Sequence, residues 1–262
     1  MSKGLGTEQV AELLVDVAAE VVRPRWRNLS DDQVHTKSSR TDLVTVADRE
    51  AEVLITEVLE RAYPDALLVG EEAVAADASV LADISTAERV FVIDPVDGTR
   101  NFVNGSPDYA VMVAETLAQE TVRAWIWQPE HQRMFIAERG AGARCNGEPL
   151  PPLTPGTDDL VGAVTARRLL DPDRVPGLRW PIPMTNFACG IDYPELASGR
   201  IDYAAYNGVH PWDHLPGTLL VTEVGGVAKH LNGTRYRVDT TGGPILTAAS
   251  EEAWQIARRA FH

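Results

Sequence analysis

The stretch VFVIDPVDGTRNF, residues 90–102, constrains the fold most, because an apolar run ends abruptly in two acids. Residues 90–93 are four consecutive apolar residues, typical of a buried strand, and Asp94 and Asp97 follow directly. A buried carboxylate is costly unless a cation is paired with it. The acids therefore lie either in a solvated turn or beside a positive ion. Pro95 would stiffen the segment that carries them.

Hydrophobic periodicity elsewhere predicts both helices and strands. Apolar residues at helical spacing predict a helix over 7–22, with Thr7 as its N-cap, and a second helix over 46–62. Three short strand-like runs between 109 and 138 predict an antiparallel meander. Further elements are expected as strands within 65–72, 89–94, 161–165, 201–206 and 244–248, and as helices near 188–198, after Trp212 and from Ser250. The fold class is mixed α/β with layered sheets and helices.

The domain organisation follows from length and one loop. A chain of 262 residues suffices for one large domain or two modest ones. The Pro-rich segment 149–159 is the best candidate for a boundary. We expect a single domain over 1–262, with subdomains over 1–150 and 151–262.

Composition excludes several classes of function. The formal net charge of −14 argues against nucleic acid and against an anionic membrane surface as partners. No apolar run reaches transmembrane length, and the first residues lack the apolar core of a signal peptide. Cys145 and Cys189 have no metal-binding or redox spacing, which is typical of buried thiols in a cytoplasmic protein. We expect a cytoplasmic location.

The acids recur in clusters at predicted strand ends and helix starts. These clusters are Glu71 with Glu72, Asp94 with Asp97, Asp213, and a weaker group of Asp42 and Asp48. Oxygen ligands without His or Cys suit Mg²⁺, Mn²⁺ or Ca²⁺. Acids from distant segments suit a multi-metal site in which an activated water attacks phosphorus. Each cluster alone has a simpler interpretation, such as a solvated turn or a helix cap.

Four blocks occur in order: KSSRTDLVTVAD (37–48), GEE (70–72), DPVDGTRNF (94–102) and WDHLPGTLLVTEVGG (212–226). Together they resemble the inositol monophosphatase family of metal-dependent phosphate monoesterases, over nearly the full chain. The resemblance implies a layered αβαβα sandwich of the inositol monophosphatase and sugar phosphatase type. It also implies a homodimer that uses two to three Mg²⁺ ions per site, with Mn²⁺ as the alternative ion, and a small phosphorylated metabolite as substrate.

Position by position, the resemblance implies a set of metal ligands. Asp94 would bridge two metals, and Val96 would contribute its backbone carbonyl. Asp97 and Asp213 would form the second metal site. Glu71 would bind metal and would also be the partner of the attacking water.

The resemblance implies further roles around these ligands. Thr99 would help to orient the water, and Asp48 would support Thr99. The amides of Gly98 and Thr99 would hold the phosphate. Lys37 would lie on a loop that closes over the metals. Other substrate-binding candidates are Asp97, Cys189, Tyr206 and Asp213.

The substrate-recognising positions depart from the inositol pattern. Tyr206, seven residues before Asp213, stands where inositol-cleaving members carry a Glu that holds substrate hydroxyls. Met184 stands at the position of an Arg, and Arg100 follows Thr99 where a smaller or uncharged residue is common. Arg100 could face the substrate phosphate or lie on the surface. Inositol monophosphate is the default substrate. Histidinol phosphate, fructose 1,6-bisphosphate, 3′-phosphoadenosine 5′-phosphate and NADP are alternatives, and an aromatic Tyr206 would favour an aryl or heteroaryl substrate.

A function of a different class also stays open. The chain could be a non-catalytic regulator that binds metal or phosphate and has kept the fold. A degenerate regulator would be expected to have lost at least one residue of the implied catalytic set. Glu71, Asp94, Asp97, Thr99 and Asp213 are all present, which favours an enzyme.

Overall fold

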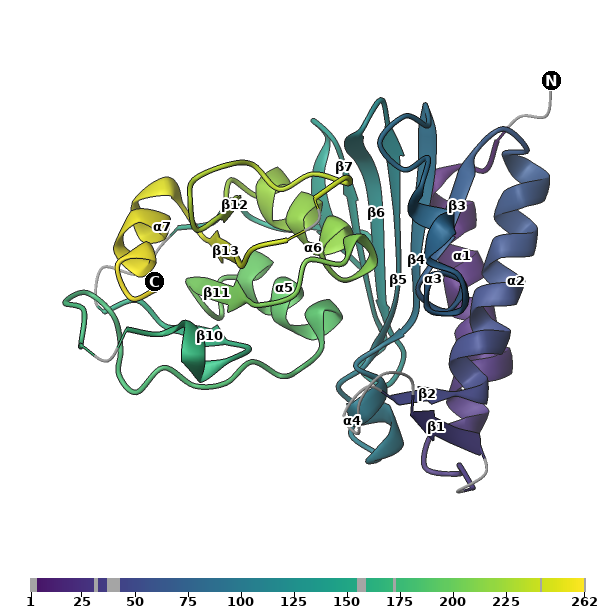
Figure 1. Cartoon of the computed structure of the whole chain (residues 1–262), viewed down its shortest axis with the longest axis horizontal. Helices are drawn as coiled ribbons and strands as arrows, with labels where there is room; N and C mark the ends of the chain where they lie inside the picture. Colours follow the sequence, from purple (N-terminus) through teal and green to yellow (C-terminus); the bar gives the residue numbers. More distant parts are fainter. Residues whose placement is uncertain are drawn as a thin grey trace.

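The computed structural model describes residues 4–30, 33–36, 43–154, 159–171, 173–240 and 242–261. Its elements form five layers, seen edge-on in Figure 1: a pair of helices, a large sheet, a second pair of helices, a small sheet and a final helix. The predicted αβαβα sandwich is therefore confirmed. The chain passes from the large sheet to the small one after residue 149, while the division into subdomains at residue 150 stays a prediction.

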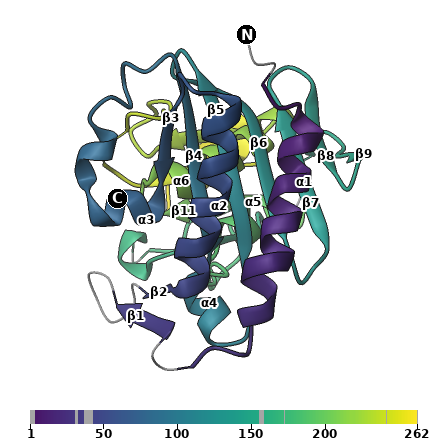
Figure 2. The same cartoon turned by 90° about the vertical axis from the view of Figure 1, so that its right-hand side faces the viewer.

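The first layer consists of α1 (Thr7–Val17) and α2 (Val46–Ala62), which lie side by side over one face of the large sheet (Figure 2). The α1 helix continues as a π-helical turn over Ala18–Val22 and a 3₁₀ turn over Arg23–Arg25. The prediction of Thr7 as N-cap was wrong, because Gly6 is the N-cap. The Thr7 hydroxyl instead donates a hydrogen bond to Glu138 Oε2 (2.7 Å).

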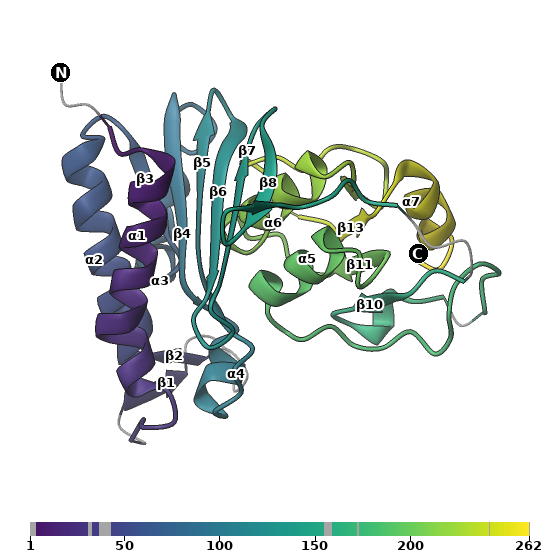
Figure 3. The same cartoon turned by 180° about the vertical axis from the view of Figure 1, so that it is seen from behind.

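The large sheet has the strand order β3-β4-β5-β6-β7-β8-β9. Figure 3 shows the molecule from behind, so that the sheet is seen from its other edge. Its strands are β3 (Leu67–Gly70), β4 (Arg89–Asp97), β5 (Ala110–Leu117), β6 (Glu120–Gln128), β7 (Arg133–Glu138), β8 (Gly142–Cys145) and β9 (Glu148–Pro149). Only β3 and β4 pair in parallel; every later pair is antiparallel. The predicted meander is confirmed and is extended by β8 and β9.

Short elements join these layers near one end of the large sheet. Strands β1 (Val34–Thr36) and β2 (Leu43–Thr45) form a small antiparallel ribbon before α2. Helix α3 (Glu71–Ala76) follows β3 directly and leads to a 3₁₀ turn, η4 (Ala78–Leu81), and α4 (Thr99–Val103) follows β4. Both helices therefore begin where a strand of the large sheet ends.

The second half of the chain builds the remaining layers. Its elements are β10 (Gly162–Val164), η5 (Arg167–Leu169), α5 (Cys189–Ala197), β11 (Tyr203–Tyr206), α6 (Pro211–Glu223), β12 (Val227–His230), β13 (Ile245–Ala248) and α7 (Glu251–Arg258). The small sheet has the order β10-β11-β13-β12. The α6 helix begins at Pro211 and not after Trp212, since a proline favours the first turn of a helix.

The α5 and α6 helices lie between the two sheets and approach each other closely. A Cβ atom added to Gly217 of α6 would lie 2.0 Å from Cγ of Tyr193 on α5, so only glycine fits there. This contact holds the two helices in a fixed relation. Within the described ranges, none of the helices has both the length and the apolar character needed to cross a bilayer.

Candidate metal centre

Asp94 and Asp97 converge because β4 contains a bulge. In a regular strand the side chains alternate, so residues three positions apart point to opposite faces. Asp94 pairs with Met112 of β5 and Asp97 pairs with Ala110, so three steps along β4 match two steps along β5. The irregularity shifts the alternation and lets both carboxylates meet at one place.

Asp213 joins these two acids from the first turn of α6. One carboxylate oxygen from each of Asp94, Asp97 and Asp213 lies within 4.8 Å of the others. Glu71, the first residue of α3, is close enough for its charge to raise the pKa of Asp94. The end of β4 and the start of α6 therefore bring three predicted acidic ligands together, and Glu71 at the start of α3 acts on them through its charge.

Asp97 is tied to the N-terminus of α5. Its Oδ1 accepts a hydrogen bond from the backbone N–H of Cys189 (3.1 Å), and its Oδ2 accepts one from Gly190 (2.7 Å). The positive end of the helix dipole favours a carboxylate at this place. Burial nevertheless raises the pKa of Asp97 above its ordinary value, against the opposing effect of the two amides. Asp97 therefore both orders α5 and needs further positive charge.

Asp94 is the most deeply buried of the four predicted acidic ligands, with 1% exposure. Its pKa lies well above the ordinary value because of burial first, and then because of the charges of Glu71, Asp97 and Asp213. Within the described part of the chain, Asp94 Oδ1 has no hydrogen-bond partner. An ionised carboxylate in this setting is stable only beside a cation, and an all-oxygen donor set suits Mg²⁺, Mn²⁺ or Ca²⁺.

Asp48 connects α2 to the start of α4. Its Oδ2 accepts hydrogen bonds from the backbone N–H (2.9 Å) and the hydroxyl (2.5 Å) of Thr45. The Thr99 hydroxyl lies 3.1 Å from Asp48 Oδ1 and 3.0 Å from the carbonyl oxygen of Val96. Burial raises the pKa of Asp48 to about 7. The sequence-predicted pairing of Asp48 with Thr99 is therefore present in the structure.

Glu52, one turn after Asp48 on α2, is a residue that sequence reasoning missed. Its Oε2 accepts a hydrogen bond from the N–H of Glu72 (2.7 Å), and its Oε1 accepts one from Ala73 (2.8 Å). Burial raises its pKa to about 7. A Cβ atom on Gly70 would lie 2.1 Å from the Glu52 carboxyl carbon, so glycine allows this approach. Glu52 therefore fixes the first turn of α3, which begins with Glu71.

The i, i+4 spacing of Asp48 and Glu52 was the available signal. Residues four apart share one face of a helix. Both are acids in the first two turns of a helix that covers the large sheet. They therefore lie near the ends of the strands that carry the acid cluster. One face of α2 thus supports two separate loops of the acid cluster.

The structure also places the other predicted residues. Gly98 is the N-cap of α4 with φ of +81°, and a Cβ atom there would lie 2.8 Å from Cβ of Ala188, so glycine is required. Cys189 contributes its amide to Asp97 and is a half-buried free thiol, as is Cys145. Lys37 and Asp42 lie outside the described residues.

Tyr206 does not form an exposed wall in this structure, because it is 1% exposed on β11. Its ring stacks on Tyr193 with a centroid distance of 4.9 Å. Its hydroxyl has no hydrogen-bond partner among the residues that the structure describes. Met184, the other position of the expected substrate wall, makes an isolated bridge to Val164 at the edge of the small sheet. Contact of Tyr206 with substrate stays a prediction.

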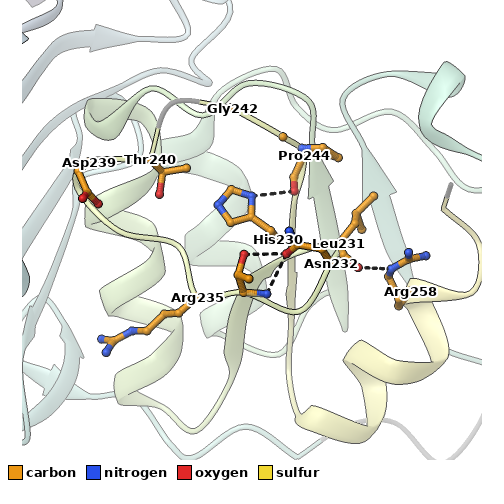
Figure 4. A pocket seen from close by; sticks show the side chains of 11 residues that line it. His230, Leu231, Asn232, Arg235, Asp239, Thr240, Gly242, Pro244 and Arg258 are labelled. Atoms are coloured by element: carbon orange, nitrogen blue, oxygen red, sulfur yellow. Dashed lines mark hydrogen bonds between the residues drawn. The ribbon is translucent and has the colours of Figure 1, made fainter.

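A cavity of about 560 Å³ lies apart from the acid cluster, none of whose members lines it (Figure 4). Its polar groups already bind within the fold. His230 Nδ1 lies 3.3 Å from the carbonyl oxygen of Pro244, and Arg258 donates to the carbonyls of Leu231 and Phe261. The bond from Arg258 to Leu231 holds α7 against the small sheet. The chemistry of the chain therefore gathers at the acid cluster.

Comparisons with known proteins agree with this geometry. A model of the inositol monophosphatase family matches residues 7–260. Inositol monophosphatase 2 of Homo sapiens is 31% identical over 256 residues, which cover 90% of this chain and 81% of that protein. The Nus factor SuhB of Pasteurella multocida (strain Pm70) is 32% identical over 241 residues, which cover 87% of this chain and 86% of that protein. A solved IMPase/NADP phosphatase structure, complexed with Mg²⁺ and phosphate, has a TM-score of 0.78 at 22% identity, over 95% of each chain.

Proposed function

Because the chain belongs to the inositol monophosphatase family, we propose that it hydrolyses a small phosphate monoester and releases inorganic phosphate. The observation that carries this proposal is the convergence of Asp94, Asp97 and Asp213, whose oxygens lie within 4.8 Å of one another. These acids come from segments more than a hundred residues apart in the chain. A fold that gathers like charges in a buried place is suited to binding cations.

Mg²⁺ fits the donors that are present. Two to three ions would be held by the carboxylates of Glu71, Asp94, Asp97 and Asp213 and by the carbonyl of Val96, with Mn²⁺ as the alternative ion. The unpartnered Oδ1 of Asp94 supports this assignment. When bound, such ions offset the repulsion among the acids, lower the pKa of a water and stabilise a leaving oxygen.

Thr99 and Glu71 would hold the attacking water. When the Thr99 hydroxyl donates its proton to Asp48, its oxygen is free to accept a hydrogen bond from a water molecule. Thr45 donates two hydrogen bonds to the Asp48 carboxylate and fixes its position. The fixed carboxylate in turn orients the Thr99 hydroxyl. Glu71 would accept a hydrogen bond from the other O–H group of the same water. Glu52 would act on this step only indirectly, by fixing the turn that carries Glu71.

The phosphate would lie at the start of α4. Gly98 adopts a left-handed conformation there, and the first-turn amides of a helix have no acceptor within the helix. The amides of Gly98 and Thr99 would therefore donate to phosphate oxygens. Cys189 would lie beside the substrate, because its backbone N–H binds Asp97. Lys37 would lie on a loop that closes over the metals.

Inositol monophosphate remains the default substrate, and the cytoplasm and a homodimer are the proposed location and assembly. The substrate preference stays open because Tyr206 and Met184 replace the inositol-type residues. Human inositol monophosphatase 2 supports the default. The second candidate is a non-catalytic regulator, and one relative carries the name of a Nus factor, not of a phosphatase. Light scattering of the purified chain would test the dimer.

Phosphate release with and without Mg²⁺ tests the proposal. The substrates are inositol 1-phosphate, histidinol phosphate, fructose 1,6-bisphosphate, 3′-phosphoadenosine 5′-phosphate and NADP. We expect at least one Mg²⁺-dependent activity that is lost in Asp97→Asn. Asp65→Asn is the matched control, because Asp65 is exposed and lies outside the cluster. If no ester releases phosphate although calorimetry shows that Mg²⁺ binds, the non-catalytic regulator would be favoured.

A further inference from the structure

The segment 185–188, just before α5, is held against the loops of the acid cluster. Asn101 of α4 donates a hydrogen bond through Nδ2 to the carbonyl of Asn186 (2.8 Å). Asn186 in turn donates through its backbone N–H (2.9 Å) and its Nδ2 (2.8 Å) to Asp192 Oδ1. Ala188 packs on Gly98, and the next two amides bind Asp97. The segment is therefore a rigid part of the site's rim.

Phe187 lies in the middle of this segment and is exposed. Among the described residues, two large hydrophobic side chains are exposed: Phe187, at 49%, and Val53 of α2, at 55%. Phe187 also has φ of +58°, in the left-handed region that favours glycine. A backbone conformation of this kind in a pinned segment points to a functional constraint. Ordinary packing does not explain the ring, since half of it faces solvent.

Arg100 supplies the second part of the surface. It follows Thr99 in α4 and is exposed, and its guanidinium carbon lies 5.9 Å from the centre of the Phe187 ring. The two side chains bring a flat aromatic ring and a flat cation together beside the turn that begins with Gly98. Both groups stack on planar π-systems, such as the base of a nucleotide.

We propose that Phe187 and Arg100 form a stacking surface that selects phosphate monoesters whose alcohol carries a planar heteroaromatic ring, as a nucleoside does. The inference rests on the proposed phosphatase function and adds a substrate class to it. The aromatic side chain exposed beside the acid cluster is Phe187, whereas Tyr206 is buried. Arg100 acts in this surface through its planar face.

A matched pair of esters tests the proposal: adenosine 5′-monophosphate and ribose 5-phosphate, which share the sugar and the ester and differ in the base. The measured quantity is the ratio of their kcat/KM values at saturating Mg²⁺. We expect the wild-type protein to prefer the nucleotide by about tenfold, mainly through KM. The ratio should fall towards one in Phe187→Gly and fall in Arg100→Gln, and it should be retained in Phe187→Tyr and in the control Val53→Ala.

Folding and recognition can be separated in the same variants. Glycine suits a positive φ, so Phe187→Gly should keep the thermal midpoint of the wild-type protein. A wild-type ratio near one, or an unchanged ratio in Phe187→Gly, would overturn the stacking surface while leaving the phosphatase in place. Failure to hydrolyse any ester of the wider panel would instead refute the proposed function, and the inference with it.

Discussion

Replacing Glu52 by glutamine should change how the stability of the metal-free protein depends on pH. Glu52 is buried, and its pKa is raised from 4.5 to about 7. A carboxyl whose pKa is higher in the folded than in the unfolded state contributes stability at low pH. That contribution is lost as the pH rises through the folded-state pKa. The wild-type protein should therefore lose stability through this group as the pH rises from about 4.5 to beyond 7.

The magnitude follows from the two pKa values. Linkage between 4.5 and about 7 gives a loss of about 2.5 kcal/mol between pH 5 and pH 8. Glutamine has the same shape and cannot ionise, so Glu52→Gln lacks this contribution. Between pH 5 and pH 8, the unfolding free energy of the variant should therefore rise by about 2.5 kcal/mol relative to that of the wild type.

Urea unfolding followed by tryptophan fluorescence, in EDTA at pH 5, 6, 7 and 8, measures the effect. Glu60→Gln, an exposed position on the same helix, is the control and should parallel the wild type. Parallel curves for Glu52→Gln and the wild type would refute the reasoning. In the presence of Mg²⁺, kcat should fall about tenfold in Glu52→Gln, because the amide group can accept only one of the two N–H bonds that orient α3.

Three further outcomes are expected. Gly217→Ala should lower the unfolding free energy by about 3 kcal/mol, because its Cβ would overlap Tyr193, whereas Gly208→Ala should stay within about 0.5 kcal/mol in the same denaturation assay. Glu115→Gln should cost about 3–5 kcal/mol, since it leaves two arginines without their buried partner; an unchanged midpoint would contradict this. Phosphate release should rise from pH 6 to 8, because the raised pKa of Asp97 lets protons compete with Mg²⁺; an acid optimum at saturating Mg²⁺ would contradict this.

Sequence patterns were sufficient to predict helices and strands whose structure depends mainly on their own residues. The helix over 46–62 was predicted with its observed bounds, because its apolar residues have helical spacing and Pro64 follows it. The three strands of the meander were also predictable from their β-rich runs. The strands β8 and β9 were missed because they are short and lie in a Gly-rich stretch that hides their alternation. Thr7 was misassigned because its hydroxyl has a distant partner, Glu138.

The acids of the cluster were predictable as residue types in a specific order, but their convergence in space was not. Spacing alone places Asp94 and Asp97 on opposite faces of a strand, and the pairing of β4 with β5 reverses that expectation. Glu52 was missed for a similar reason. Its role depends on two amides about twenty residues away, in a turn whose position is set by β3.

The chemistry of this protein was thus determined by its sequence, because donor types, their order and the loop residues around Gly98 are written in the chain. The tertiary structure alone decided which side chains are exposed beside the acid cluster. It buried Tyr206 against Tyr193 and left Phe187 exposed beside Arg100. The physical reason is that the exposure of a side chain and its neighbours depend on packing between segments far apart in the chain. A local sequence pattern does not predict that packing.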